Sequence, residues 1–212
     1  MLNVITVLRS SAEYTPEKVL IVQSMVRQNL TIPHEFICLS DVEIPGVKTI
    51  PLKHKWKGWY AKMEIYRNDL PEGPRLYLDL DTAIVSNMDS VVEAAGACGK
   101  PFVILRDFYR GQINPYSMGS GFMYWNADFS FIYDSYVKNP IEIQGGDQVI
   151  LQRLVNFRVV AFWQDITEGV CSFKVHVRPL GYVEPKYAVV CFHGKPRPWE
   201  QTIVPYKYNS QP

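Results

Sequence analysis

The first half of the chain alternates between short apolar runs and segments in which apolar side chains recur at helical spacing. Uninterrupted apolar runs of this length are typical of strands that are buried on both faces of a sheet. Strands are predicted over residues 3–8, 36–40, 47–52 and from residue 75 onward, and helices over residues 16–29 and 59–67. The first helix follows Thr15 and begins with Pro16, which is a favoured helix start. Strands that alternate with helices predict βαβ units and a parallel sheet.

The second half of the chain has a less regular pattern, with a loop rich in glycine, asparagine, proline and serine. Strands are expected over residues 101–106, 121–126, 159–163, 173–177 and 188–193, and helices over residues 129–137 and 147–154. No repeat, low-complexity segment or linker divides the chain, so we expect one α/β domain over residues 1–200 with a mixed, mainly parallel central sheet. The polar, proline-containing residues 201–212 are expected to form an irregular tail.

Composition narrows the functional classes. The chain has 212 residues, of which 47% are hydrophobic and 20% charged, values typical of a globular protein with a core of its own. A net charge of +1 gives no global field that would recruit nucleic acid or a membrane surface, so phosphate binding would have to come from local charge. Four scattered cysteines without a CxxC motif predict a reducing, cytoplasmic location. The N-terminus is expected to be a strand rather than a signal peptide, and no apolar run approaches the roughly 20 residues of a membrane span.

The strongest chemical signal is Asp79-Leu80-Asp81, which follows an apolar run. In an extended chain Asp79 and Asp81 point to the same side, with Cα atoms about 6.5 Å apart. Two carboxylates this close repel each other, and a divalent cation between them removes the repulsion. The pair is therefore predicted to bind a metal at the mouth of a buried strand, where α/β sheets bind ligands. The alternative is that either aspartate only serves a turn or a helix cap.

Short motifs spread over nearly the whole chain together resemble a known family. They are Ala61-Lys-Met63, Tyr77-Leu-Asp-Leu-Asp-Thr82 with Ser86-Asn-Met-Asp89, Ser120-Gly-Phe122, Gly145-Gly-Asp-Gln148, and Phe192-His-Gly194 with Arg197-Pro-Trp199. In order and spacing they are similar to the motifs of GT-A-fold glycosyltransferases, and most similar to family eight, which includes glycogenin and bacterial lipooligosaccharide galactosyltransferases. The resemblance covers residues 3 to about 200. It implies a metal-dependent enzyme that moves a sugar from a nucleotide-diphosphate donor, expected to be a UDP-sugar, to a hydroxyl acceptor with retention of configuration.

In that family the two aspartates hold Mn²⁺ or Mg²⁺ against the donor diphosphate, so the resemblance assigns this role to Asp79 and Asp81. The family's third metal ligand is a histidine, and its position falls on Cys191 in this chain. His193 lies two residues later and, on an extended strand, would face the same side. We therefore expect His193 to be the third ligand, because a hard cation prefers imidazole to a thiolate. A loop histidine without a metal role is the alternative.

The resemblance also assigns residues to the donor sugar. Lys62 would reach the donor from its helix, although a lysine on a helix more often faces solvent. Asp147 and Gln148 would bind sugar hydroxyls near the reacting centre, although Asp147 could equally cap its helix. Ser120 corresponds to a donor-side turn, and Asp107, on a loop after a strand, is a further candidate for the donor sugar.

The remaining expected donor contacts lie near the two ends of the chain. Arg197 replaces the family's lysine before Pro-Trp, and with Lys195 it would neutralise the leaving diphosphate, while Gly194 is expected to contact the donor. The alternative is a basic surface loop without such a role. At the other end, the resemblance implies that the base lies against the first strand and the loop that follows it, at Thr6, Val7 and Tyr14.

Three other functions stay open on the sequence alone. A sugar-nucleotidyltransferase uses a related fold, but residues 9–14 lack the glycines that such enzymes carry after the first strand. A nucleic-acid-binding module would explain the interleaved basic and aromatic residues 53–60, which we instead expect to form a loop at the rim of the cleft. The third is a catalytically silent sugar-nucleotide binder. The acceptor, whether a glycan, a lipid-linked glycan or a protein, is expected to contact residues 106–116 and the segment after residue 200.

Overall fold

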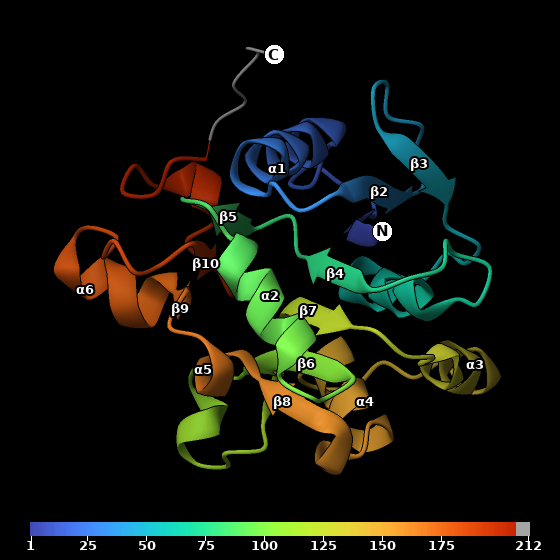
Figure 1. The fold of residues 1–212 in the computed structure, drawn as a ribbon. Helices are drawn as coiled ribbons and strands as arrows, with labels where there is room; N and C mark the ends of the chain where they lie inside the picture. Colours follow the sequence, from blue (N-terminus) through green and yellow to red (C-terminus); the bar gives the residue numbers. More distant parts are fainter. Residues whose placement is uncertain (207–212) are drawn as a thin grey trace.

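The computed structural model describes residues 1–206, which form two sheets with helices packed against them (Figure 1). The larger sheet has seven strands in the order β3-β2-β1-β4-β7-β6-β8, and the smaller has three in the order β5-β10-β9. Residues 207–212 of the predicted tail lie outside the described residues. The strands are β1 (Leu2–Leu8), β2 (His34–Ser40), β3 (Lys48–Pro51), β4 (Arg75–Leu78), β5 (Thr82–Ile84), β6 (Phe102–Arg106), β7 (Met118–Trp125), β8 (Val160–Phe162), β9 (Val170–Ser172) and β10 (Val189–Cys191).

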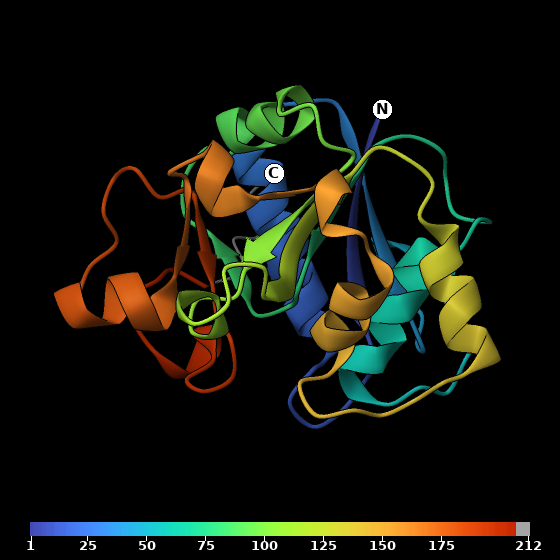
Figure 2. The ribbon, with the colours of Figure 1, turned by 90° about the horizontal axis from the view of Figure 1, so that it is seen from below.

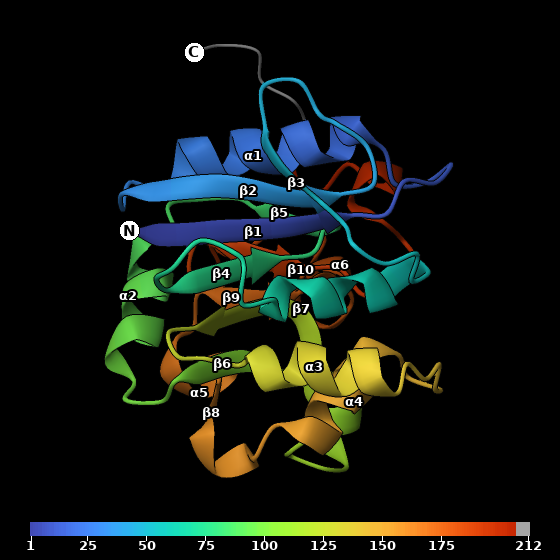
Figure 3. The same ribbon diagram turned by 90° about the vertical axis from the view of Figure 1, so that its right-hand side faces the viewer.

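The large sheet is mixed and mainly parallel, as predicted. β1 pairs in parallel with β2 and β4, β2 with β3, and β6 with β8, whereas β7 is antiparallel to β4 and β6. β1 has neighbours on both sides and is buried along most of its length, which explains its continuous apolar sequence. In Figure 3 the strands follow one another from β2 through β1, β4, β7 and β6 to β8.

Helices cover both faces of the large sheet. Residues of α1 and α2 form one buried cluster with Val4 and Leu76, and residues of η1, α3 and α4 form another with Ile5 and Tyr77. Because successive strand residues point to opposite faces, these clusters lie on opposite sides of the sheet. On the second side η1 contacts α3, and the two lie next to each other in Figure 2. The helices are α1 (Pro16–Asn29), η1 (Gly58–Tyr66), α2 (Asp89–Ala97), α3 (Ser130–Lys138) and α4 (Asp147–Leu154).

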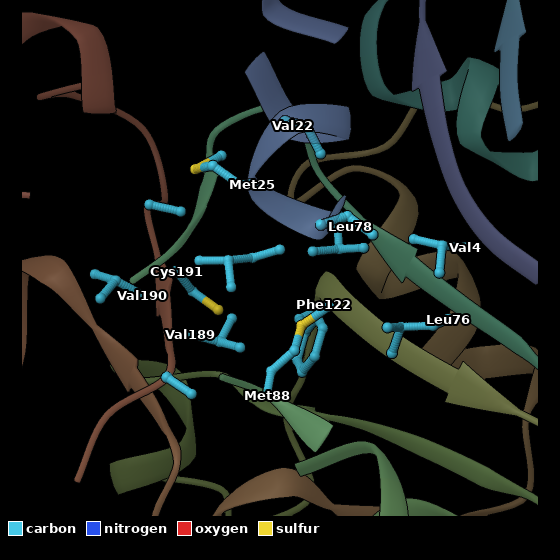
Figure 4. Packing of buried hydrophobic residues seen from close by; sticks show 14 of the residues in the cluster. Val4, Val22, Met25, Leu76, Leu78, Met88, Phe122, Val189, Val190 and Cys191 are labelled. Carbon is cyan, nitrogen blue, oxygen red and sulfur yellow. The ribbon is translucent and has the colours of Figure 1, made fainter. Parts of the chain in front are cut away.

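The first of these clusters also joins the two sheets. In the close view of Figure 4, Leu78 of β4 and Phe122 of β7 lie near Val189 and Cys191 of β10. All four side chains are almost completely buried. This shared core holds the end of β4 next to the end of β10, which brings the aspartate motif close to the C-terminal motifs.

The predicted strand from residue 75 to residue 85 is wrong as one continuous element. β4 ends at Leu78, Asp79 to Asp81 form a turn in which Thr82 N–H donates to the Asp79 carbonyl at 2.9 Å, and β5 then enters the smaller sheet. The alternation of faces in an extended chain therefore does not apply at the aspartates. The turn instead places them at the crossover between the two sheets.

The predicted strand Phe173–Val177 is also wrong. It is a helical segment, η4 (Phe173–Val177), with a π-type hydrogen-bond pattern, and it continues into α6 (Arg178–Leu180). Phe173 and Val177 are buried, and the three residues between them are partly exposed. Two apolar residues four positions apart fit both one turn of a helix and one face of a strand, so a window of five residues does not distinguish the two. The Ser172 hydroxyl accepts a hydrogen bond from Val175 N–H and so caps the start of this segment.

The other predicted elements are present with small changes in their bounds, whereas α2 and β9 were not predicted. The helix predicted over residues 59–67 is the 3₁₀ helix η1, and the helix predicted over residues 147–154 is α4. Residues 201–206 form no helix or strand, but Tyr206 is buried and donates to the Leu80 carbonyl at 2.5 Å. All four cysteines are free thiols. Within residues 1–206, no helix is both long and apolar enough to cross a membrane. The short helices are η2 (Arg110–Gln112), η3 (Phe157–Val159), α5 (Trp163–Ile166) and η5 (Pro198–Glu200).

Candidate active site

A cavity of about 730 Å³ opens where β1 and β4 end and the smaller sheet begins. Open α/β sheets bind ligands at the carboxyl ends of their strands, and this cavity has that position. Five acidic and three basic side chains line it, so its formal charge is −2. These residues are Glu13, Asp79, Asp81, Asp107 and Asp147 against Arg9, Lys62 and Arg197. A lining with this net negative charge favours the binding of a cation, or of an anionic ligand that binds together with a cation.

Asp79 lies on the wall of this cavity and is held from three sides. Its Oδ1 accepts a hydrogen bond from the Tyr77 hydroxyl at 2.5 Å and lies 2.9 Å from Lys62 Nζ. Its backbone N–H donates to the Gly121 carbonyl at 2.9 Å. A Cβ on Gly121 would lie 3.3 Å from Asp79 Oδ2, so the absence of a side chain there lets the carboxylate lie directly against β7.

Lys62 connects Asp79 to Asp147. Its side chain is only 5% exposed, and its ammonium lies 3.1 Å from Asp147 Oδ2 and 3.1 Å from Ser120 Oγ. The Ser120 hydroxyl also donates to Asp147 at 2.5 Å. Burial alone would lower the pKa of Lys62, but the charges of Asp147 and Asp79 outweigh it and raise the pKa, so the ammonium stays protonated. Lys62 and Ser120 both line the cavity, and a solvent-facing Lys62 is excluded.

Asp81 lies on the other side of the turn and contacts Arg197. Arg197 Nη1 lies 2.5 Å from Asp81 Oδ2, and its Nε lies 3.1 Å from Glu13 Oε1. The guanidinium also covers the ring of Tyr14 at 5.2 Å. Burial and then the charge of Asp79 raise the pKa of Asp81 to about 7, and Arg197 offsets only part of this rise. The charged form of Asp81 is therefore disfavoured mainly by burial and secondly by its neighbour Asp79.

The structure does not bring His193 into one group with the two aspartates. Its Nε2 lies 2.7 Å from the Ser172 hydroxyl, and its ring stacks on Phe108 with centroids 5.8 Å apart. Burial, followed by the charge of Lys174, lowers the pKa of His193 to about 4, so the ring is neutral at neutral pH. Across residues 1–206, no three histidine, cysteine or acidic side chains are grouped closely enough to hold a metal ion. The expected third ligand lines the cavity, but its Nε2 is hydrogen-bonded to the Ser172 hydroxyl.

The other residues predicted for the site divide into two groups. Val7, Tyr14, Gln148 and Gly194 line the cavity, as do Asp107 and Asp147. Thr6 is fully buried and does not line it, and Lys195 is 70% exposed, with its ammonium 2.5 Å from Glu200. The base contact expected at Thr6 involves its backbone, so it stays a prediction, whereas the Lys195 ammonium contacts Glu200 and does not line the cavity.

The cavity wall also contains residues that the sequence did not single out. Tyr77 donates to Asp79, Glu13 holds Arg197, and Phe108 covers His193. Tyr77 begins the motif that ends at Thr82, but the partner of its hydroxyl depends on the turn after β4. Of these three residues, only Glu13 could have been suspected from the sequence, because it directly precedes Tyr14, the aromatic residue that is expected to contact the base.

The basic and aromatic segment over residues 53–60 forms part of the cavity rim, as expected. Gly58 and Trp59 line the cavity, and Trp59 is 60% exposed. His54 and Trp56 stack on each other with centroids 4.0 Å apart, and His54 Nε2 contacts the Tyr133 hydroxyl at 2.8 Å. These two rings are packed against each other and against α3, so they do not present the free stacking surfaces that a single-strand nucleic-acid binder needs.

No protein-family model matches the sequence, and no curated protein matches it. Solved structures do match. An active-site mutant of LgtC superposes with a TM-score of 0.62 at 14% identity, over 98% of this chain and 92% of LgtC. The galactosyltransferase LgtC in complex with donor and acceptor sugar analogues gives 0.61 at 14%, over 96% and 91%. The glycosyltransferase GlyE of Streptococcus pneumoniae TIGR4 gives 0.61 at 15%, over 95% of this chain and 57% of GlyE. The chain therefore has the GT-A fold of these glycosyltransferases.

Proposed function

We propose that the protein is a glycosyltransferase that moves a sugar from a nucleoside diphosphate donor, expected to be a UDP-sugar, to a hydroxyl acceptor. The observation that carries this proposal is the pair Asp79 and Asp81, which flank one turn at the carboxyl edge of the sheet and both line the cavity. The likeness to LgtC, which has been solved with donor and acceptor sugar analogues, supports the substrate class. The acceptor is expected to be a glycan, a lipid-linked glycan or a protein.

A divalent cation, Mn²⁺ or Mg²⁺, fits the donor set that Asp79 and Asp81 present. The formal charge of −2 on the cavity lining indicates missing positive charge, and the repulsion between Asp79 and Asp81 contributes to the raised pKa of Asp81 after burial. Mg²⁺ is commonly held by one or two carboxylates together with substrate phosphates, so a third protein ligand is not required. When bound, such a cation supplies Lewis acid stabilisation to the departing diphosphate.

The protein's own cations would act on either side of this pair. Lys62 holds Asp79 and Asp147 in fixed positions, because one buried ammonium contacts both carboxylates. Arg197 lies on Asp81 at the cavity wall, where a guanidinium could contact a phosphate through two N–H groups and neutralise the leaving group. Val7 and Tyr14, at the end of β1 and in the following loop, would contact the base.

Asp147 and Gln148 would position the donor sugar at the start of α4. Asp147 Oδ2 already accepts from Ser120 and contacts Lys62, so its carboxylate serves as a fixed acceptor for sugar hydroxyls. We assign no carboxylate as a nucleophile. Retention would then follow from front-side attack assisted by the leaving diphosphate, with most of the rate coming from positioning and charge neutralisation.

The proposal is tested with the purified chain and a panel of nucleotide sugars, each with Mn²⁺ or with EDTA. The cognate donor should raise the melting temperature only with metal, by an amount that corresponds to about 2.7 kcal/mol at a hundredfold excess over Kd. Asp81→Asn should remove the metal-dependent shift and lower sugar transfer at least about hundredfold, as expected for the loss of a group that stabilises transition-state charge. Asp134→Asn, on the exposed side of α3, is the matched control. Undiminished transfer by Asp81→Asn would refute the metal assignment, and the absence of any donor binding by the wild type would refute the function.

A further inference from the structure

Lys174 is a cation beside the cavity without a counter-charge. It lies in the first turn of η4, is partly buried, and extends toward Gly194, where a Cβ would lie 3.6 Å from its Nζ. Gly194 and the neighbouring His193 both line the cavity. Within residues 1–206, neither a carboxylate nor a hydrogen-bond acceptor contacts the Lys174 ammonium. An ammonium without such a partner has its full charge available for an anionic ligand.

The cations that line the cavity, and Arg110 and Lys195 beside it, differ from Lys174, because each is already paired with acidic side chains. A paired cation has part of its charge compensated before any ligand arrives, so it attracts an anion less strongly. The pairs are Arg9 with Asp41, Lys62 with Asp79 and Asp147, Arg110 with Asp107, Lys195 with Glu200, and Arg197 with Asp81 and Glu13.

The topology of the smaller sheet brings Lys174 to the same edge as the aspartate turn. β10 pairs antiparallel with β5 and parallel with β9, with Cys191 opposite both Thr82 and Ser172. The three strands lie together in Figure 1. Asp81 immediately precedes β5, and Lys174 follows β9 by two residues, so both leave the sheet at the end of β10. Two strand spacings separate them, about 10 Å between backbones, which the flexible four-carbon stem of lysine can largely bridge.

We propose that Lys174 binds the diphosphate of the donor, opposite the aspartate pair and across the backbone of residues 192–194. This inference rests on the proposed function and extends it, because it names a phosphate-binding residue outside the motifs that resemble the family. The cavity lining carries a formal charge of −2, so a diphosphate needs cations beyond the paired ones to enter it. Lys174 supplies one that no acidic side chain compensates.

The surroundings of His193 fit this assignment. His193 lies close enough to Lys174 for the lysine charge to contribute to its lowered pKa, after burial. Its ring is fixed by the Ser172 hydroxyl, by stacking on Phe108 and by the edge contact with Tyr109 at 5.3 Å. The imidazole is therefore neutral and held by three contacts. Lys174, by contrast, has a charged and flexible side chain that can move to contact a bound phosphate.

The test compares binding of UDP and of uridine, each measured by calorimetry or ligand-observed NMR in the presence of Mn²⁺. Lys174→Ala should weaken UDP binding about ten- to hundredfold, the effect of losing one hydrogen bond to a charged group, and leave uridine binding unchanged. Lys174→Arg should restore most of the UDP affinity. Lys138→Ala removes an equal charge at the exposed end of α3 and should change neither affinity, and all variants should keep the wild-type melting temperature.

Each other result overturns the inference in a recognisable way. Unchanged UDP affinity in Lys174→Ala, with the wild type binding UDP, refutes the role of Lys174 and leaves the glycosyltransferase proposal intact. An equal loss of UDP and uridine binding shows that Lys174 only supports the wall of the cavity. A wild-type protein that binds neither UDP nor any other nucleoside diphosphate overturns the proposed function together with this inference.

Discussion

Replacing Lys62 by methionine should destabilise the protein strongly, although methionine nearly matches the shape of the lysine stem. The wild-type ammonium is 5% exposed and contacts Asp79 Oδ1 at 2.9 Å and Asp147 Oδ2 at 3.1 Å. Lys62→Met leaves both carboxylates in place without their shared counter-charge. Removing one partner of a buried ion pair costs about 3–5 kcal/mol, because the remaining charge stays desolvated and unpaired. For a chain of this length that corresponds to a melting temperature lower by about 6–20 °C.

The measurement is urea denaturation of the wild type, Lys62→Met and the double variant Lys62→Met/Asp147→Asn. The double variant should be more stable than the single one, because it removes one of the two uncompensated charges. Mn²⁺ should stabilise Lys62→Met more than the wild type, because a cation next to Asp79 replaces part of the lost charge. Lys138→Met, at the exposed end of α3, should stay within about 0.5 kcal/mol of the wild type. A single variant as stable as the wild type would show that Lys62 is not the counter-charge of these aspartates.

Two further predictions address the turn and the histidine. Gly121→Ala should displace the Asp79 carboxylate by a few tenths of an ångström, because the new Cβ would lie 3.3 Å from Oδ2, and should lower sugar transfer about tenfold. Gly96→Ala, inside α2, is the control and should leave transfer unchanged. Equal effects in the two variants would contradict the geometric role of Gly121. Because folding lowers the pKa of His193 from 6.5 to about 4, only the unfolded chain takes up this proton as the pH decreases through that window. The free energy of unfolding should therefore fall from pH 6.5 to pH 4 less steeply in His193→Gln, measured by urea denaturation, and identical slopes would refute the assignment.

The local pattern of apolar and polar residues was enough to predict most of the helices and strands. The helix predicted from the proline after Thr15 begins and ends where α1 does, and the helix predicted at Asp147 coincides with α4. Both segments have helical spacing over at least two turns and a clear starting residue. Phe173–Val177 has neither, since five residues with apolar ends fit a strand and a helical turn equally well.

The two aspartates line one cavity, as expected for a pair that points to the same side, but the reason differs from the one that the sequence suggested. The alternation of faces in a strand predicted one common side for Asp79 and Asp81, yet the chain turns between them and changes sheet. They share a cavity because the core around Leu78 and Val189 holds the two sheets together. The two-residue alternation of a strand predicts which face each side chain points to, but it does not predict where the strand ends in the tertiary structure.

The sequence by itself determined the α/β order of elements, the mainly parallel sheet and the residue types that gather at its carboxyl edge. The tertiary structure alone decided which charges pair. Lys62 meets Ser120 across 58 positions and Arg197 meets Asp81 across 116. It also decided that His193 bonds to Ser172 rather than joining the aspartates, and that Lys174 lies beside Gly194. The physical reason is that spacing along a chain fixes local backbone geometry, whereas contacts between distant charges depend on how two separately formed sheets pack.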